Sequence, residues 1–308
     1  MSNPLKAILK KLLQRNSVKK RESQLRKTLR HVTRQEIARD LKKMGIVEGD
    51  AVFLHSSMKS LGYVEGGPKA VIGALLDAIG PNGTLLLPTY YLPGGTILAT
   101  CQMTDYVFDP RIHGTNMGAL PTAFLKEPNV YRSVHPTHSV SALGKDAAYF
   151  TEKHHLAPSV FGLGSPWERF HLRNGKVLGL GISMGPVTFY HLLEDMMGDA
   201  FLEQIWEAET YRLPVIDLAG KRSEVSVRPY RPEFTARRID HPSREDLRSF
   251  MSQFLTQQNT LHLATVASAN AWFITAENFL RALQDLAANG ITIYTPPEKL
   301  TLLSRMRN

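Results

Sequence analysis

Short apolar runs alternate with amphipathic segments in the first third of the chain. Residues 51–54 are apolar throughout, and a stretch predicted to be a helix follows at 70–79. A Gly-Pro-Asn-Gly turn at 80–83 then leads into a second, largely apolar run at 84–88. Runs of this length are typical of strands buried on both faces, and a helix between two of them favours a parallel βαβ unit.

The same alternation returns in the second half. Residues 176–182 form another apolar run, and a helix predicted at 276–288 precedes an apolar run at 291–294 that we expect to be a strand. Because helices must cover both faces of such a sheet, the pattern predicts an α/β fold, a three-layer αβα sandwich with a largely parallel central sheet. Residues 211–244 are rich in Arg and Pro and are expected to form an irregular insertion or subdomain.

A capping box, Thr33 with Glu36, predicts a helix from there to about residue 44 and marks the start of the main domain at 33–308. The preceding arm, residues 1–32, has leucine and isoleucine at helical spacing with lysines between them. Such a basic amphipathic helix packs on its own domain or on a second copy of the chain in a homo-oligomer, or it binds a membrane surface peripherally. Disorder of the arm is the remaining alternative.

The charge and composition limit the classes of partner. The formal net charge is +9, but residues 1–34 hold eleven Lys or Arg against one acid, so the rest of the chain is close to neutral. A basic groove for nucleic acid across the main domain is therefore not expected. Cys101 is the only cysteine, which excludes an intrachain disulfide, and no apolar run reaches the ~18 residues of a membrane span. These features predict a cytoplasmic protein.

The strongest chemical signal is the segment from Thr188 to Glu194, which follows the glycine-rich end of the apolar run at 176–182. His191 and Glu194 are three residues apart, so on a helix they share one face. A carboxylate that orients an imidazole at the end of a strand makes a general base. A satisfied surface or core pair is the alternative reading of this spacing.

Two further motifs contain small polar residues. The first, His55 to Gly62, follows the first apolar run, and its hydroxyls and backbone N–H groups suit phosphate or pyrophosphate oxygens. The second is Arg-Ser-Val-His-Pro-Thr-His-Ser at 132–139, and a Gly-Ser-Pro at 164–166 lies between it and the His191 segment.

Taken in order and spacing, these motifs resemble the aminoglycoside 3-N-acetyltransferase family, which has the antibiotic N-acetyltransferase fold. The resemblance extends over residues 47–195 and weakens beyond them. It implies an enzyme, an acyl-CoA-dependent N-acyltransferase, that moves an acyl group from acetyl-CoA or a longer or hydroxylated acyl-CoA directly to the amine of an amino sugar.

The resemblance also implies roles for residues. His191 would take the proton of the attacking amine, Glu194 would orient it, and Thr188 would either contribute to the polar surroundings of the thioester carbonyl or act only as a helix cap. Imidazole suits this work because it titrates near neutral pH. Residues implied around the coenzyme are His55, Ser56, Ser57, Gly62, His135 and Ser139, with His135 more architectural than chemical.

The acceptor is an open choice between two classes. Residues 211–244 hold eight Lys or Arg against four acids, and Arg228 and Arg231 flank Tyr230. Arginine forks suit phosphate, and a tyrosine ring can stack on a nucleobase. This favours a nucleotide-linked amino sugar of surface-polysaccharide synthesis. A polycationic aminoglycoside, whose acetylation gives antibiotic resistance, is the alternative, and the acids that follow Glu194 would then line its pocket.

Three rival functions receive less support. A metal site is not expected, because no His-Glu-x-x-His or equivalent spacing joins the histidines. A dinucleotide-binding oxidoreductase is disfavoured because the glycines from Gly179 to Gly185 miss the Gly-x-Gly-x-x-Gly spacing by one residue. An inactive acyl-CoA-binding or scaffold protein would have no need of the His191–Glu194 pair.

Overall fold

The computed structural model of the chain describes residues 30–300. All but the last three residues of the arm predicted at 1–32 lie outside the described residues. The main domain begins as the sequence predicts. Thr33 caps helix α2 (Arg34–Met44), because its hydroxyl accepts a hydrogen bond of 3.2 Å from the backbone N–H of Glu36.

A seven-stranded sheet lies at the centre of the molecule, in the order β10–β11–β7–β2–β4–β6–β5. Strands β7, β2 and β4 pair in parallel, and the flanking pairs are antiparallel, so five of the seven strands run in one direction. The largely parallel sheet predicted from the sequence is thus confirmed. The strands are β2 (Ala51–Ser56), β4 (Thr84–Pro88), β5 (Tyr131–Arg132), β6 (Val140–Gly144), β7 (Lys176–Leu180), β10 (His262–Val266) and β11 (Ala269–Thr275).

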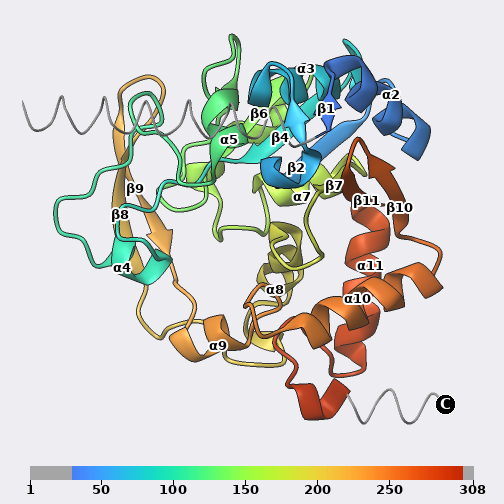
Figure 1. Cartoon of the computed structure of the whole chain (residues 1–308). Coiled ribbons are helices and arrows are strands. Elements are labelled where there is room, and N and C mark those ends of the chain that lie inside the picture. The colour runs from blue at the N-terminus through green and yellow to red at the C-terminus, as the bar shows by residue number, and fades with distance from the viewer. Residues whose placement is uncertain (1–29, 301–308) are drawn as a thin grey trace, which may run out of the picture.

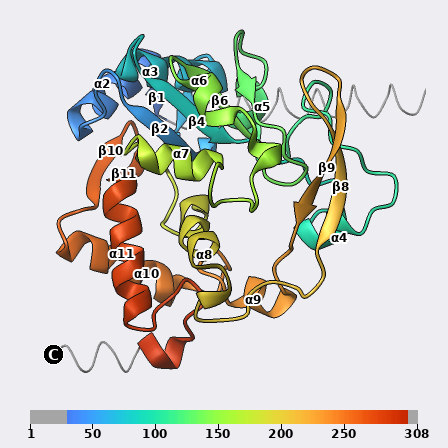
Figure 2. The ribbon, with the colours of Figure 1, turned by 180° about the vertical axis from the view of Figure 1, so that it is seen from behind.

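Helices cover both faces of the sheet, as the three-layer prediction requires (Figures 1 and 2). The helices over one face are α2, α3 (Gly67–Ile79) and α5 (Ala119–Phe124). Those over the other are α6 (Ala147–Thr151), α7 (Pro166–Leu172), α8 (His191–Met197), α10 (Glu245–Gln257) and α11 (Ala276–Ala288). Each face has its own apolar core.

Strand alternation decides which side chains face the second of these layers. In β2, Val52 and Leu54 join the core under α2 and α3, whereas Phe53 belongs to the opposite core and stacks on His55 with ring centroids 5.5 Å apart. Side chains two apart point to the same face of a strand. His55 therefore lies on the same side of the sheet as α7 and α8.

Residues 211–244 are more regular than predicted. They form a hairpin of β8 (Tyr211–Ile216) and β9 (Arg222–Val227), followed by helix α9 (Pro232–Arg237). Alternate residues of both strands, such as Leu213 and Val225, are buried in a small core with Phe108. This alternation is a strand signal that the Arg and Pro content obscured. The hairpin stands at one side of the molecule beside the short helix α4 (Ile97–Cys101; Figure 1).

Two other predictions at the carboxyl end of the chain need correction. The apolar run at 291–294 is a buried turn rather than a strand, with Thr292 and Thr295 bonded to each other. The β10–β11 hairpin was missed, because its two-residue turn, Ala267-Ser268, lacks the glycine or asparagine typical of such turns.

The remaining strands are β1 (His31–Val32) and β3 (Tyr63–Val64), which pair in parallel. Between residues 30 and 300, no helix has the length and apolar character that a membrane crossing requires.

Candidate functional site

A cavity of about 280 Å³ lies where the three parallel strands end. His55 comes from the end of β2 and Pro88 from the end of β4, while Thr188 and His191 follow β7. Ligand sites of open α/β sheets form at these carboxyl ends. The cavity therefore brings together residues from separate motifs of the sequence analysis. His55 and Thr188, for example, are 133 positions apart in the chain.

The His191–Glu194 pair is buried on one wall of this cavity. His191 is the first residue of α8, and its Nδ1 lies 2.8 Å from Glu194 Oε2. A carboxylate only accepts hydrogen bonds, so Nδ1 carries a proton, and in the neutral imidazole the lone pair is on Nε2. His191 lines the cavity and its ring packs at 4.8 Å from that of Phe161. The arrangement can accept a proton from a group bound in the cavity.

Two tyrosines hold Glu194 in place. Tyr230 donates to Oε2 at 2.8 Å and Tyr294 to Oε1 at 3.0 Å, and Glu194 itself is only 1% exposed. Burial raises the pKa of both tyrosines, so they remain protonated donors. Three donors, including His191, thus compensate the buried carboxylate. The sequence analysis missed Tyr294, which lies in the turn that was taken for a strand.

Tyr230 has a different surrounding from the one predicted. It was expected as a stacking surface for a nucleobase, but its hydroxyl is used by Glu194 and its ring lies against that of His191, with centroids 5.2 Å apart. Only 8% of Tyr230 is exposed. Tyr230 lines the cavity, but it contacts Glu194 and His191 there and does not offer an exposed ring on which a nucleobase could stack.

Thr188 is part of the short 3₁₀ turn, Thr188–Tyr190, that precedes α8, and its side chain makes no capping bond there. Its hydroxyl accepts a 3.0 Å hydrogen bond from the Trp167 indole and contacts His55 Nε2 at 3.5 Å. Burial lowers the pKa of His55 to about 4, so this imidazole is neutral at physiological pH. Thr188 therefore presents a hydroxyl to the cavity from a fixed position.

The loop after β2 is held by its backbone. Ser57 N–H donates to Leu180 O at 2.9 Å, and Ser60 N–H donates back to Ser57 O at 3.2 Å. The Ser57 side chain makes no capping bond to the turn that follows. Ser56 and Ser57 are both half-buried. Gly62 has φ +91°, and a Cβ there would meet the Arg30 carbonyl oxygen at 3.0 Å, so glycine is required by the backbone.

His135 and Ser139 are interior residues that do not line the cavity. His135 Nδ1 accepts the backbone N–H groups of Thr137 and His138 at 3.3 and 3.1 Å, and its ring stacks on that of His154. Ser139 donates to Thr89 O at 2.8 Å and accepts from Arg132 Nε at 3.1 Å. Both residues hold the loop through these bonds and neither lines the cavity, whereas His138, three residues after His135, does line it.

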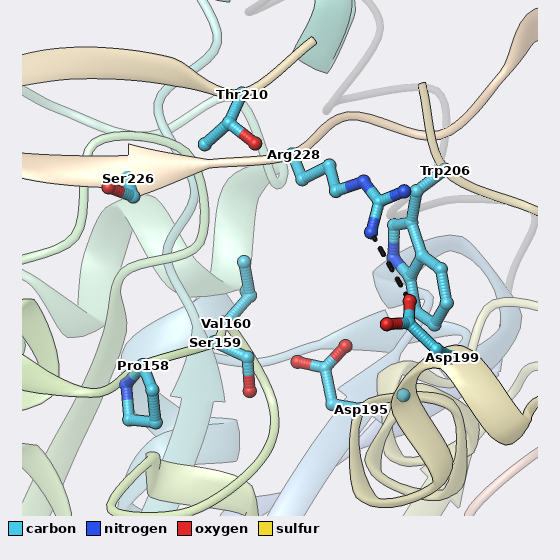
Figure 3. Close-up of a pocket in the computed structure, with 10 residues that line it drawn as sticks. Pro158, Ser159, Val160, Asp195, Asp199, Trp206, Thr210, Ser226 and Arg228 are labelled. Carbon is cyan, nitrogen blue, oxygen red and sulfur yellow. Dashed lines mark ion pairs between the residues drawn. The ribbon is translucent and has the colours of Figure 1, made fainter. Parts of the chain in front are cut away.

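Arg228 and Arg231 point elsewhere. Arg228 lines a second pocket of about 230 Å³, where it lies over the Trp206 ring, faces Asp199 at 3.9 Å and donates to Glu207 O at 2.8 Å. Figure 3 shows this guanidinium beside Trp206, above Asp199. Arg231 pairs with Glu233. Neither Arg228 nor Arg231 lines the cavity at the strand ends, so the structure does not bring the two predicted phosphate-binding arginines together there.

One arginine of this segment does reach the cavity, together with an acid that was not predicted. Arg238 donates to both carboxylate oxygens of Asp240, at 2.7 and 2.8 Å, and both residues line the cavity. Burial opposes the charge of Asp240, but the bonds from Arg238 outweigh it and keep the pKa of the carboxyl below its ordinary value. The cavity thus contains a fixed carboxylate near His191. Across residues 30–300, no group of three or more potential metal ligands occurs.

Comparison with known proteins gives consistent results. A sequence model of the family described as aminoglycoside 3-N-acetyltransferase matches residues 53–288. Aminoglycoside N(3)-acetyltransferase III of Acinetobacter baumannii is 34% identical over 204 residues, which cover 63% of this chain and 68% of that protein. The crystal structure of aminoglycoside acetyltransferase AAC(3)-Xa matches with a TM-score of 0.69 at 29% identity, over 86% of this chain and 95% of that one.

A further solved structure, AAC-IIIb as a binary complex with CoASH, has the same fold. Its TM-score is 0.70 at 23% identity, and the match covers 87% of this chain and 100% of that one.

Proposed function

Because this chain belongs to the aminoglycoside 3-N-acetyltransferase family, we propose that it acetylates the 3-amino group of an aminoglycoside, with His191 as the general base. The chain is an acyl-CoA-dependent N-acyltransferase, and acetyl-CoA fits as its co-substrate. The observation that carries the proposal is the buried His191–Glu194 pair with a free Nε2 on the wall of a cavity at the strand ends.

The chemistry follows from the protonation states. His191 Nε2 takes a proton from the attacking amine, and Glu194, held by two tyrosine hydroxyls, stabilises the imidazolium that forms. The proton then passes to the coenzyme sulfur as the thioester bond breaks. The proposed transfer is direct, without an acyl-enzyme. Cys101, the only cysteine, is not suited to carry the acyl group, because it is buried outside the cavity and burial raises the pKa of its thiol to about 12.

An aminoglycoside is a better acceptor for this site than a nucleotide-linked amino sugar. The two arginines that suggested phosphate have carboxylate partners, Arg228 with Asp199 and Arg231 with Glu233, and so does Arg238 at the cavity, with Asp240. At the cavity itself, Arg238 is the one arginine among the lining residues within 30–300, and both oxygens of Asp240 bond to it, so no unpaired guanidinium faces a phosphate group there. The relatives are also named for aminoglycosides.

For the coenzyme, the half-buried loop at residues 55–62 remains the proposed contact, through the hydroxyls of Ser56 and Ser57. His55 lines the cavity between this loop and Thr188. His135 and Ser139 are not part of the proposed coenzyme site, because neither lines the cavity and because His135 Nδ1 and the Ser139 hydroxyl bond to the protein.

The test is a steady-state comparison of acceptors with the full-length protein, with thiol release from acetyl-CoA as the readout. We expect a higher kcat/KM for kanamycin- or gentamicin-type drugs than for a nucleotide-linked amino sugar, and a product acetylated at N3 by NMR. A higher kcat/KM for the nucleotide sugar would overturn the acceptor assignment and leave the transferase chemistry standing.

A further inference from the structure

Tyr90 carries a buried hydroxyl that the fold does not use. It follows β4 by two residues, lines the cavity and is 7% exposed, yet its oxygen has no hydrogen-bond partner among residues 30–300. Leaving such a group unpaired costs about 1–3 kcal/mol. Phenylalanine would fill the same space without that cost, so the hydroxyl calls for another explanation.

The position of Tyr90 is nevertheless well fixed. Its backbone oxygen accepts the N–H of Asn116 at 2.9 Å and the hydroxyl of Thr115 at 2.8 Å. Its ring meets the edge of His138, with centroids 4.8 Å apart. The backbone bonds and the ring contact of Tyr90 therefore fix the position of its unpaired hydroxyl in the cavity.

The groups around the hydroxyl are those of an acyl-transfer centre. Thr188 is the neighbouring hydroxyl. Burial raises the pKa of Tyr90 and Thr188 opposes that rise, but the Tyr90 oxygen has no partner at hydrogen-bond geometry among residues 30–300. Because the Trp167 indole donates to Thr188, the hydrogen of the Thr188 hydroxyl is left for His55 Nε2, at 3.5 Å, or for a bound carbonyl oxygen. The same cavity holds His191 with its free Nε2. Two hydroxyl donors and one base thus line a single space.

We propose that Tyr90 is a catalytic residue whose hydroxyl donates a hydrogen bond to the carbonyl oxygen of the acyl thioester. The proposal rests on the proposed acyl transfer and adds a residue to it. Donors aimed at an oxygen where charge develops stabilise the transition state, and each contributes about 10²–10³-fold to turnover.

The electrons and protons balance as follows. The amine nitrogen bonds to the carbonyl carbon, and the C=O pair moves onto oxygen, where the Tyr90 hydrogen bond strengthens. The pair returns as the carbon–sulfur bond breaks and the thiolate leaves. His191 carries the amine proton to that sulfur, while Tyr90 keeps its own proton throughout.

Tyr90→Phe is the direct test, and Tyr106→Phe is the matched control. Tyr106 is an equally buried tyrosine, but its hydroxyl donates to Pro136 O at 2.6 Å and it does not line the cavity. Tyr90→Phe should lower kcat about 10²-fold, change either KM by less than about twofold, and leave Tm equal or higher because an unpaired hydroxyl is removed. Tyr106→Phe should lower Tm and leave kcat unchanged.

A second readout does not depend on the acceptor. The infrared stretch of acetyl-CoA labelled with ¹³C at its carbonyl should fall on binding to the wild-type protein and return toward its free value in Tyr90→Phe. If no aminoglycoside is acetylated, the proposed function fails while this measurement still decides the role of Tyr90. Three results for Tyr90→Phe would overturn the proposal. The first is an infrared stretch and a kcat that both equal those of the wild type, the second is an effect on the KM of the acceptor alone, and the third is a lower Tm with unchanged kcat.

Discussion

Thr89 and Tyr90 are neighbours in the chain but belong to two polar regions with opposite properties. The first region is the Arg132 network, made of Arg132, Thr89, Ser139 and Ser141. Arg132 donates to Thr89 O at 2.6 Å and to Ser139, and the Thr89 hydroxyl meets Ser139 O at 3.1 Å and Ser141 at 2.9 Å. In the cavity lined by Tyr90 and His191, by contrast, neither the Tyr90 hydroxyl nor His191 Nε2 has a hydrogen-bond partner among residues 30–300.

The comparison separates structural from functional polar residues. Both regions are buried and both contain residues from motifs that the sequence analysis selected. Where every polar atom is bonded within the protein, the group stabilises the fold; where one is left available in a cavity, the group can bind a ligand. Breaking either region should therefore affect different measurements.

The largest expected effect is in the cavity. His191→Ala should lower kcat by at least ~10²-fold, the usual contribution of a general base, without changing the affinity for acetyl-CoA or the cooperativity of unfolding. The kcat of Glu194→Gln should lie between that of His191→Ala and that of the wild type. The amide oxygen still accepts the hydrogen bond from His191, but without a negative charge it does not stabilise the imidazolium.

The matched control for the base is His262→Ala, on the exposed edge strand β10. It should retain wild-type kcat. If His191→Ala keeps near-full activity at neutral pH, His191 is not the general base, and the assignment of the cavity as the functional region is contradicted.

In the Arg132 network, the expected effect is on stability. Arg132→Met leaves the carbonyl oxygens of Thr89, Gly114 and His113 without their donor, so we expect a loss of about 3 kcal/mol in the free energy of unfolding. Urea denaturation measures it. Activity per folded molecule should change by less than about threefold, and weakened acetyl-CoA binding at unchanged stability would contradict this assignment.

Acid should destabilise the protein through the buried histidines. Burial lowers the pKa of His55 to about 4 and of His154 to about 3, below the ordinary value of 6.5. Their contribution to stability is complete above pH 6.5 and is lost as the pH falls, because the unfolded chain then binds more protons. At pH 5 each histidine costs about 2 kcal/mol.

Asp195 works in the opposite direction. Burial raises its pKa to about 6, so its neutral form favours the folded state and offsets about 1 kcal/mol of the loss at pH 5. Urea unfolding at pH 7.5 and pH 5 should show the net fall. His55→Gln should reduce the difference by about 2 kcal/mol, and exposed His262→Gln should leave it unchanged. If His55→Gln lost as much unfolding free energy between pH 7.5 and pH 5 as the wild type, groups other than His55 would be responsible for the loss of stability in acid.

The sequence predicted what is local and missed what is distant. The unit β2–α3–β4 was predictable because buried parallel strands are continuous apolar runs, whereas the edge strand β10 has one buried residue, Val266, and exposes others such as Leu263. The His191–Glu194 pair was predictable from its spacing. Its supporting tyrosines were not, since Tyr230 and Tyr294 lie 36 and 100 residues beyond Glu194.

Charge partners were missed for the same reason. Counting bases and acids within 211–244 gave an arginine surplus, but Arg228, Arg237 and Arg244 pair with Asp199, Glu203 and Asp246, which lie outside that segment. Tyr90, in contrast, carried a usable signal, because it is a polar side chain at the carboxyl end of a buried strand, two residues after β4, and His55 is at the corresponding end of β2.

The smallest expected effects come from two serines that the sequence analysis assigned to the same coenzyme site. Ser139 bonds to Thr89 O and Arg132, so Ser139→Ala should cost about 1 kcal/mol of stability and leave the KM for acetyl-CoA unchanged. Ser57 makes no capping bond and is half-buried in the proposed coenzyme loop, so Ser57→Ala should raise that KM severalfold at unchanged Tm. The two measurements form a crossed pair. If Ser139→Ala weakened acetyl-CoA binding and Ser57→Ala only lowered Tm, internal bonding would no longer distinguish structural from ligand-binding residues in this protein.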